Sequence, residues 1–345
     1  MLYTFDHNVD LKRFVQGREK DLRTQVVELN QAVGKLLTTA IFQNGSGKKL
    51  LAKGHLISEE DVRLLLTVGQ RQVAVAQLEE NDIPEEEAAL AVASESACGS
   101  MEIHMAAGGR ANLLATEDSC LLVVNDLLQE INSSGCVTMA TLANLAFAGA
   151  RQRVATVKTA PFAVPRDDFQ RVVQLVKQRG PILQARPIRE PAIGVLYTDP
   201  CNAERSRQLF EGIMTTRLER LHVGATFALS AIEEETAVAR GLEYLIRARP
   251  TLILVASTTA PAGPDDVVGR ALRRVGCQLE RFLAPVEPGN LLLLCYAGDT
   301  PVVTAPGCFR SPKLNVVDMI LPPLLARYRV TAREVSALGH GGLLQ

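Results

Sequence analysis

The chain has 345 residues, 47% hydrophobic and 22% charged, which is enough for two or three domains with apolar cores and excludes a disordered chain. The 37 Lys and Arg against 38 Asp and Glu leave a formal net charge of −1, which excludes a global positive field for nucleic acid or an anionic membrane. Trp is absent and aromatics make up 4%, which disfavours a stacking platform for single-stranded nucleic acid.

The N-terminal residues and the cysteines set the expected compartment. Asp6 and Asp10 interrupt the apolar stretch that a signal peptide needs, and no later run approaches the roughly 18 apolar residues of a membrane span. The seven Cys and five His are scattered without a CxxC pair, so neither a disulfide framework nor a zinc site is expected. We expect a cytosolic protein with no membrane partner.

Residues 1–84 predict a small mixed α+β module. Apolar runs at 32–42 and 72–78 suggest strands. Between them Ser58 is a predicted N-cap, with acids at 59–61 in the first turn and Gly69 at the end, so a short helix is expected. The acidic run at 79–89 contains a proline and predicts a solvated connector.

Residues 85–189 predict a β-rich middle module closed by a helix. Short apolar runs at 121–124, 137–142 and 153–165 indicate strands. A helix is expected over 167–179, where Phe169, Val172, Val173 and Val176 recur at helical spacing. Lys158, on a strand-like stretch, is either an exposed edge charge or a ligand-binding residue.

Residues 190–345 predict a three-layer α/β domain with a mostly parallel sheet. Strands and helices alternate along it at 192–198, 203–221, 225–232, 233–249 and 251–257. Such alternation implies right-handed crossovers and a sheet covered on both faces. Ligands of these sheets bind at the carboxyl ends of the strands, which here follow Thr198 and Ser257.

The loop after the third strand offers two interpretations. Ser257, Thr258 and Thr259 supply hydroxyl groups, and Asp265 and Asp266 stand at the start of the next helix. Acids in a first turn cap a helix and interact favourably with its dipole, by roughly 0.3–1 kcal/mol. The same acids suit a magnesium ion or a general base, since hard cations select carboxylate oxygen.

A second cluster lies at 306–313. Ser311 is a predicted N-cap with Pro312 at the first helical position, so the preceding loop would meet a helix N-terminus. Gly307 permits close approach, and Arg310 and Lys313 add positive charge, so the segment predicts an anion or phosphate site. The Pro-Gly-Asn turn at 288–290 suggests a tight connection before a strand.

The order of these motifs resembles the molybdopterin-binding domain shared by molybdopterin adenylyltransferases and molybdopterin molybdenumtransferases. The matching pairs are Thr198 with Asp199, Asp265 with Asp266, Pro288 with Gly289, and Pro306 with Gly307. Segments 32–41 and 52–75 also resemble the N-terminal region of a molybdenumtransferase. The stretches at 109–114 and 155–165 are most similar to an uncharacterised branch of molybdopterin-binding proteins.

The resemblance implies a role for each matching residue. Asp266 would be the metal ligand and catalytic acid, with Asp265 beside it. Arg310, Lys313 and the Gly307 backbone would hold the phosphate. The implied cofactor-binding residues are Thr198, Asp199, Ser257, Thr258, Thr259, Pro288, Gly289, Asn290, Pro306, Gly307, Cys308, Arg310, Ser311 and Lys313. The implied cofactor is molybdopterin, with Mg²⁺ and molybdate if the protein is an enzyme, and the implied oligomer is a homodimer.

Departures from the family pattern keep two functions open. Thr258 and Thr259 stand where active members have paired glycines, Pro261 removes an N–H donor, and Cys308 replaces an Asn. The chain is therefore either a transferase that inserts molybdate, or a catalytically silent escort that hands molybdopterin to a cytidylyltransferase or an apo-molybdoenzyme. A third class, a generic α/β nucleotide-binding protein, is disfavoured because the sequence has no P-loop or GxGxxG.

Overall fold

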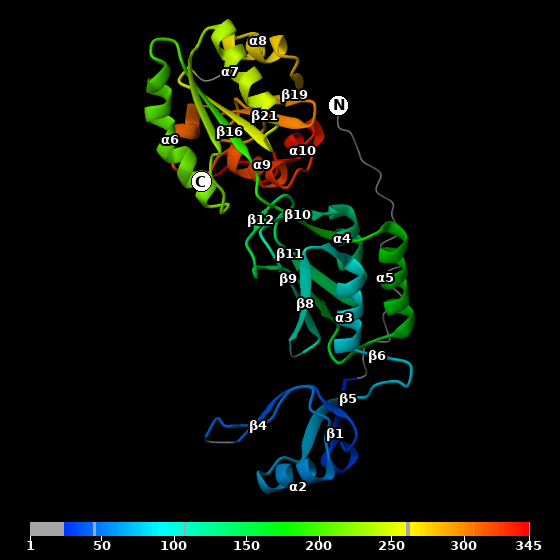
Figure 1. The fold of residues 1–345 in the computed structure, drawn as a ribbon. Coiled ribbons are helices and arrows are strands. Elements are labelled where there is room, and N and C mark those ends of the chain that lie inside the picture. Colours follow the sequence, from blue (N-terminus) through cyan, green and yellow to red (C-terminus); the bar gives the residue numbers. More distant parts are fainter. Residues whose placement is uncertain (1–23, 44–45, 107, 260–262, 306, 345) are drawn as a thin grey trace, which may run out of the picture.

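Figure 1 shows three successive parts, which we call the N-terminal module (24–76), the middle module (83–187) and the C-terminal domain (193–344). The computed structural model describes residues 24–43, 46–106, 108–259, 263–305 and 307–344, without the side chain of Cys308.

The N-terminal module is a small antiparallel sheet packed on one helix. Its elements are β1 (Thr24–Glu28), η1 (Leu29–Gln31), β2 (Leu36–Leu37), β3 (Ile41–Phe42), β4 (Lys49–Leu51), α2 (Glu59–Thr67) and β5 (Gln72–Ala76). The sheet order is β1-β5-β2, and β3 pairs with β4. The helix predicted from Ser58 is confirmed, because the Ser58 hydroxyl accepts from the Asp61 N–H at 3.2 Å and the Asp61 carboxylate accepts from the Ser58 N–H at 2.9 Å.

The middle module places two four-stranded sheets around three helices. Its elements are β6 (Ile83–Pro84), α3 (Glu85–Ser96), β7 (Ala97–Gly99), β8 (Met101–Ala106), β9 (Arg110–Ala115), β10 (Ser119–Val123), α4 (Asn125–Asn132), β11 (Val137–Thr141), β12 (Phe147–Ala148), β13 (Arg153–Thr159), β14 (Ala163–Val164), α5 (Arg166–Arg179) and β15 (Leu183–Pro187). The sheet orders are β12-β10-β15-β7 and β11-β13-β9-β8. The predicted closing helix is confirmed as α5.

One expectation for this region is wrong in part. The acidic run at 79–89 is a connector only at its beginning, since β6 pairs with β14 and Glu85–Glu87 form the first turn of α3. Acids are favourable in that position because they interact with the positive end of the helix dipole. The composition that suggested a solvated connector therefore also starts a helix whose Ala88, Val92 and neighbouring small residues are buried.

The C-terminal domain is built on a six-stranded, mostly parallel sheet, as predicted. Its elements are β16 (Ile193–Asp199), α6 (Ala203–Glu219), β17 (Phe227–Ile232), α7 (Glu235–Arg247), β18 (Leu252–Ser257), α8 (Val267–Arg274), β19 (Gln278–Phe282), β20 (Leu293–Ala297), β21 (Thr300–Ala305), η2 (Gly307–Arg310), α9 (Val316–Leu325) and α10 (Ala332–Ala337). The sheet order is β17-β16-β18-β21-β20-β19. Neighbours β17, β16, β18 and β21 are parallel, whereas β20 is antiparallel to both of its neighbours.

Helices cover both faces of this sheet. Apolar residues of α6 and α9 pack on one face, and those of α7 and α8 pack on the other. Every residue of β16 and β18 is buried, which explains why both read as continuous apolar runs in the sequence. The core under α6 and α9 also takes in Cys120 and Leu145 of the middle module and Ile188, which follows it directly. The middle module and the C-terminal domain thus share a hydrophobic core.

Candidate functional site

The carboxyl ends of β16, β17 and β18 meet at one edge of the large sheet. Thr198 lies opposite Ala231 of β17 and opposite Ser257 of β18, and Asp199 lies opposite Ile232. This register places Thr198 and Asp199, the residues predicted after the first strand, next to Ser257, the hydroxyl residue predicted after the third strand. We call this group, with Thr258, Thr259 and Glu233, the carboxyl-edge cluster.

Glu233 is at the centre of this cluster and was missed in the sequence. Its carboxylate accepts hydrogen bonds from the Thr198 hydroxyl at 2.9 Å, from the Ser257 hydroxyl at 2.5 Å and from the Thr259 hydroxyl. The Ser257 and Thr259 hydroxyls are also 2.9 Å apart. Its position in the sequence could have identified it as a site residue, because Glu233 directly follows the second parallel strand, just as Asp199 ends the first.

Asp199 is a buried carboxylate in the same cluster. One oxygen accepts from the backbone N–H groups of Cys201 at 2.8 Å and Asn202 at 2.9 Å, and the other accepts from the Thr258 hydroxyl at 2.7 Å. The Arg205 guanidinium lies 3.7 Å from it. The Thr258 hydrogen bond and these N–H donors lower the pKa of Asp199. Asp199 is therefore ionised at neutral pH, in spite of its burial.

Asp266, the implied metal ligand, is the N-cap of α8. One of its carboxylate oxygens accepts from the Gly269 N–H at 2.7 Å, and the other is 3.4 Å from the Gly263 nitrogen. Asp265 is exposed and forms an ion pair with Arg273 at 2.7 Å. Of the two interpretations of this pair of acids, the structure shows the helix cap.

This donor set does not fit a magnesium ion held by Asp265 and Asp266. Magnesium requires octahedral oxygen ligands at close range, but one carboxylate is directed at backbone N–H groups and the other at a guanidinium. No group of three or more His, Cys, Asp or Glu side chains in the described residues has a spacing that could hold a metal ion. We therefore derive no chemical step through a metal.

The segment after β21 brings one cation to the cluster. Gly307–Arg310 form the short helix η2, and the Arg310 guanidinium donates to the Thr258 carbonyl at 2.9 Å and lies 5.4 Å from the centre of the Phe210 ring. Lys313 is exposed. Pro306 lies outside the described residues, as does the side chain of Cys308.

The prediction that a helix begins at Ser311 is wrong. Helix α9 begins at Val316, because Asn315 and Asp318 form a capping box in which the Asp318 carboxylate accepts from the Asn315 N–H at 2.8 Å. The Asn315 side chain also accepts from the Val317 N–H at 2.9 Å. Residues 311–315 are held as a loop by the buried Arg217 guanidinium, which donates to the carbonyls of Ser311 at 2.6 Å and Lys313 at 2.8 Å. The local preference of Ser311 and Pro312 for a helix start is outweighed by these contacts.

The Pro-Gly-Asn turn packs against the same helix. Gly289 has φ +127°, and a Cβ there would lie 2.7 Å from the Val316 side chain. Asn290 donates from its side chain to the Ala284 carbonyl at 2.9 Å. The turn, which includes Pro288, thus occupies the N-terminus of α9, in keeping with the tight connection expected from its sequence.

Together, fold and site define a multidomain α/β protein that gathers two carboxylates, four hydroxyl groups and a guanidinium at the carboxyl edge of a mostly parallel sheet. A family model for a domain of unknown function, DUF8806, matches residues 26–77. No curated protein matches the chain.

Among solved structures, the chain is similar to a molybdenum cofactor biosynthesis protein from Pyrococcus furiosus, with 12% identity and a TM-score of 0.25 over 92% of this chain and 69% of that one. The molybdopterin biosynthesis MoeA protein from Pyrococcus horikoshii gives 11% identity and a TM-score of 0.31, over 94% of this chain and 80% of that one. At these identities and TM-scores the similarity assigns no activity. In the described part of the chain, no helix is both long enough and apolar enough to cross a membrane.

Proposed function

We propose that the C-terminal domain binds molybdopterin, or a nucleotide form of it, at the carboxyl-edge cluster and does not transform it. The observation that carries this proposal is the placement of Arg310. Within the described residues it uses one guanidinium N–H, on the Thr258 carbonyl, and its other four N–H groups can donate to a phosphate group beside the cluster. Lys313, three residues further on, adds a second cation.

The state of the acids favours binding over catalysis. Asp266 is committed to capping α8, and Glu233 accepts from three hydroxyl groups, so neither carboxylate is poised to take a proton from a substrate. Thr258 and Thr259 in place of paired glycines narrow the approach of a ligand to the backbone. These features support an escort that passes the cofactor to a cytidylyltransferase or an apo-molybdoenzyme. We further propose that it works as a cytoplasmic homodimer.

A second candidate function rests on Asp199 and Glu233. The two carboxylates end neighbouring parallel strands, which is the kind of edge at which α/β enzymes place catalytic acids. On this alternative the protein inserts molybdate into activated molybdopterin, and Asp199→Asn abolishes insertion while cofactor binding persists.

The test is to replace the two cations and measure binding of molybdopterin to the purified chain by fluorescence of the oxidised pterin. Arg310→Ala and Lys313→Ala should each weaken binding by about 1.5–3 kcal/mol, the value of a hydrogen bond to a charged group. Arg240→Ala, an exposed position on α7, is the matched control and should leave affinity unchanged. Equal affinity in all three variants would refute the site.

Complementation separates the two functions. The escort proposal expects that the chain retains molybdopterin but fails to restore a strain that lacks its molybdenumtransferase. Restoration of that strain by the wild-type chain, lost with Asp199→Asn, would select the transferase.

A further inference from the structure

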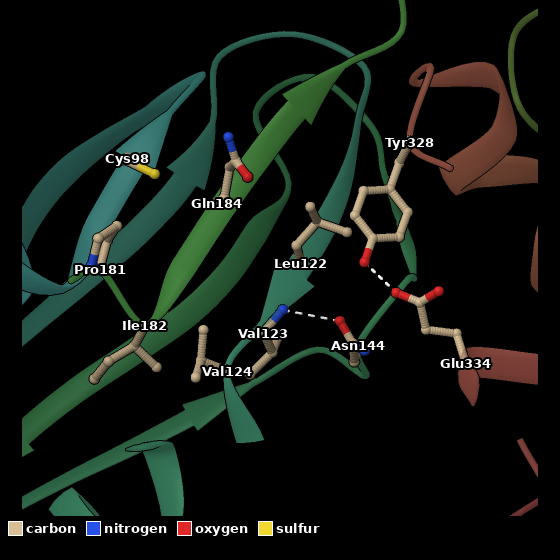
Figure 2. A pocket seen from close by; sticks show the side chains of 10 residues that line it. All are labelled: Cys98, Leu122, Val123, Val124, Asn144, Pro181, Ile182, Gln184, Tyr328 and Glu334. Carbon is tan, nitrogen blue, oxygen red and sulfur yellow. Dashed lines mark hydrogen bonds between the residues drawn. The ribbon is translucent and has the colours of Figure 1, made fainter. Parts of the chain in front are cut away.

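A cavity of about 470 Å³ lies at the junction of the middle module and the C-terminal domain (Figure 2), and it shares no lining residue with the carboxyl-edge cluster. Its volume is in the range of small-molecule sites. It is lined by Cys98, Leu122, Val123, Val124, Asn144, Pro181, Ile182, Gln184, Tyr328 and Glu334. The first eight belong to the middle module, and the last two come from the segment after α9.

The floor of the cavity is one row of side chains across three neighbouring strands. Leu122 of β10 is paired with Gln184 of β15, and Gln184 is paired with Cys98 of β7. Paired residues present their side chains on the same face of a sheet. The neighbours Leu121 and Leu183 point to the opposite face, where they are buried in the core of the middle module. The row is thus the face turned toward the C-terminal domain.

The opposite wall is the ring of Tyr328, which is held in place. Its hydroxyl donates to the Glu334 carboxylate, and the Arg186 guanidinium lies 5.9 Å from the ring centre. Glu334 also accepts from the Thr331 N–H at 2.6 Å and the Thr331 hydroxyl at 2.7 Å. Burial and the Glu334 carboxylate raise the pKa of Tyr328 to about 12, so its hydroxyl remains a neutral donor. A fixed aromatic ring therefore faces the row of Leu122, Gln184 and Cys98.

The hydrogen-bonding groups that remain open are neutral. The side-chain oxygen of Asn144 accepts from the Val123 N–H at 2.9 Å, but within the described residues the side-chain nitrogen of Asn144 has no partner. The amide of Gln184 makes no hydrogen bond there either. Together with the lone pairs of the Tyr328 oxygen, these amides offer both donors and acceptors.

Among the described residues, the lining carries one acidic side chain and no Lys, Arg or His. That side chain is Glu334, and in the described part of the chain it has no cation within 4.0 Å. Three of the roughly four acceptor sites of this carboxylate already take hydrogen bonds from Tyr328 and Thr331, which leaves little room for a cationic ligand to bind it. A phosphate or carboxylate in contact with Glu334 would be repelled, and the Arg186 guanidinium, 5.9 Å from the centre of the Tyr328 ring, does not line the cavity.

We propose that this cavity binds a small neutral nucleobase or nucleoside, with the flat base against the Tyr328 ring and its edge hydrogen-bonded to Gln184 and Asn144. A base of this kind combines a planar apolar face with alternating donors and acceptors on its edge. Because the two walls belong to different parts of the chain, the bound base would link the middle module to the C-terminal domain.

The test measures binding of guanosine and cytidine to the full chain by equilibrium dialysis. Val124, 43% exposed at the rim, can be enlarged to fill the cavity, and Val33, 45% exposed in the N-terminal module, provides the matched control. Val124→Trp should weaken nucleoside binding roughly tenfold or more, and Val33→Trp should not change it. The two nucleosides distinguish a purine from a pyrimidine site.

A milder variant tests the hydrogen-bonding edge without filling space. Gln184→Leu should weaken binding roughly two- to tenfold, as expected for a lost hydrogen bond. Gln208→Leu, an exposed position on α6, is its control. Circular dichroism checks that each variant is folded.

Two further probes test the charge of the site. Val124→Trp should change the binding of guanosine monophosphate little or not at all. It should likewise leave the binding of putrescine unchanged. The proposal is overturned if neither nucleoside binds at millimolar concentration, if nucleoside binding survives Val124→Trp, or if putrescine or the monophosphate is the ligand whose binding that variant removes.

Discussion

Replacing Arg217 by Ala should loosen the segment that carries Arg310 and Lys313. The Arg217 side chain is 1% exposed and forms an ion pair with Asp318, which is 14% exposed. Its guanidinium also holds the carbonyls of Ser311 and Lys313 and lies 4.7 Å from the centre of the Phe309 ring. The substitution thus removes the guanidinium that donates to the Asp318 carboxylate and to two backbone carbonyl groups.

The expected magnitude follows from this burial. Removing one partner of a buried ion pair costs about 3–5 kcal/mol. Asp318 keeps some exposure and a hydrogen bond from the Asn315 N–H at 2.8 Å, so the lower end, about 3 kcal/mol, applies. A change of this size corresponds to roughly 100-fold faster amide exchange wherever exchange proceeds by local opening.

Hydrogen exchange measured by mass spectrometry on peptides from 307–325 tests this value. Arg207→Ala on the same helix is the control, since Arg207 forms an exposed i,i+4 pair with Glu211 at 2.9 Å, worth about 0.3–0.5 kcal/mol. Equal exchange of 307–325 in the Arg207→Ala and Arg217→Ala chains would refute the reasoning. Adding Asp318→Ala to Arg217→Ala should cost less than the sum of the single changes, because the unpaired carboxylate is removed.

Two other changes test stability elsewhere. Hydrogen bonds from Arg189 are the main cause that lowers the pKa of Glu117 to about 2. The ionised Glu117 therefore stabilises the fold above its ordinary pKa, and this stabilisation is lost as the pH falls toward 2. Thermal denaturation followed by circular dichroism should show that Glu117→Gln loses less stability over this pH range than the wild type does. Gly289→Ala should lower the melting temperature, because the new Cβ would lie 2.7 Å from Val316 and the residue has a positive φ. Gly212→Ala lies inside α6 with open space around the new Cβ, and it should stabilise the helix by about 0.5–1 kcal/mol. Equal melting temperatures for the two alanine variants would contradict this account.

The elements of the C-terminal domain could be predicted because burial on both faces leaves a strong signal in the sequence. Strands β16 and β18 are continuous apolar runs, and α6 and α7 repeat apolar residues at helical spacing. The start of α9 was misplaced because two local signals compete, Ser311 followed by Pro312 and the capping box of Asn315 and Asp318. Its position depends on Arg217, almost a hundred residues earlier in the chain, which binds carbonyl groups in the preceding loop.

The candidate site was predictable to the extent that topology could be inferred. Parallel strands imply that Asp199 and Ser257 share an edge, and the register confirms that their strands are neighbours. Glu233 was overlooked because it begins a run of three acids, which by itself suggests the first turn of a helix. Its three hydroxyl donors come from two other strands and the loop after them, a convergence that no local pattern shows.

The shared core has a consequence for how the protein unfolds. Cys120, Leu145 and Ile188 are buried in the core of the C-terminal domain, so a fragment that begins after residue 190 would expose the apolar surface they cover. The N-terminal module has a separate, smaller core. Calorimetry should therefore resolve two cooperative units, one for the N-terminal module and one in which the other two parts melt together.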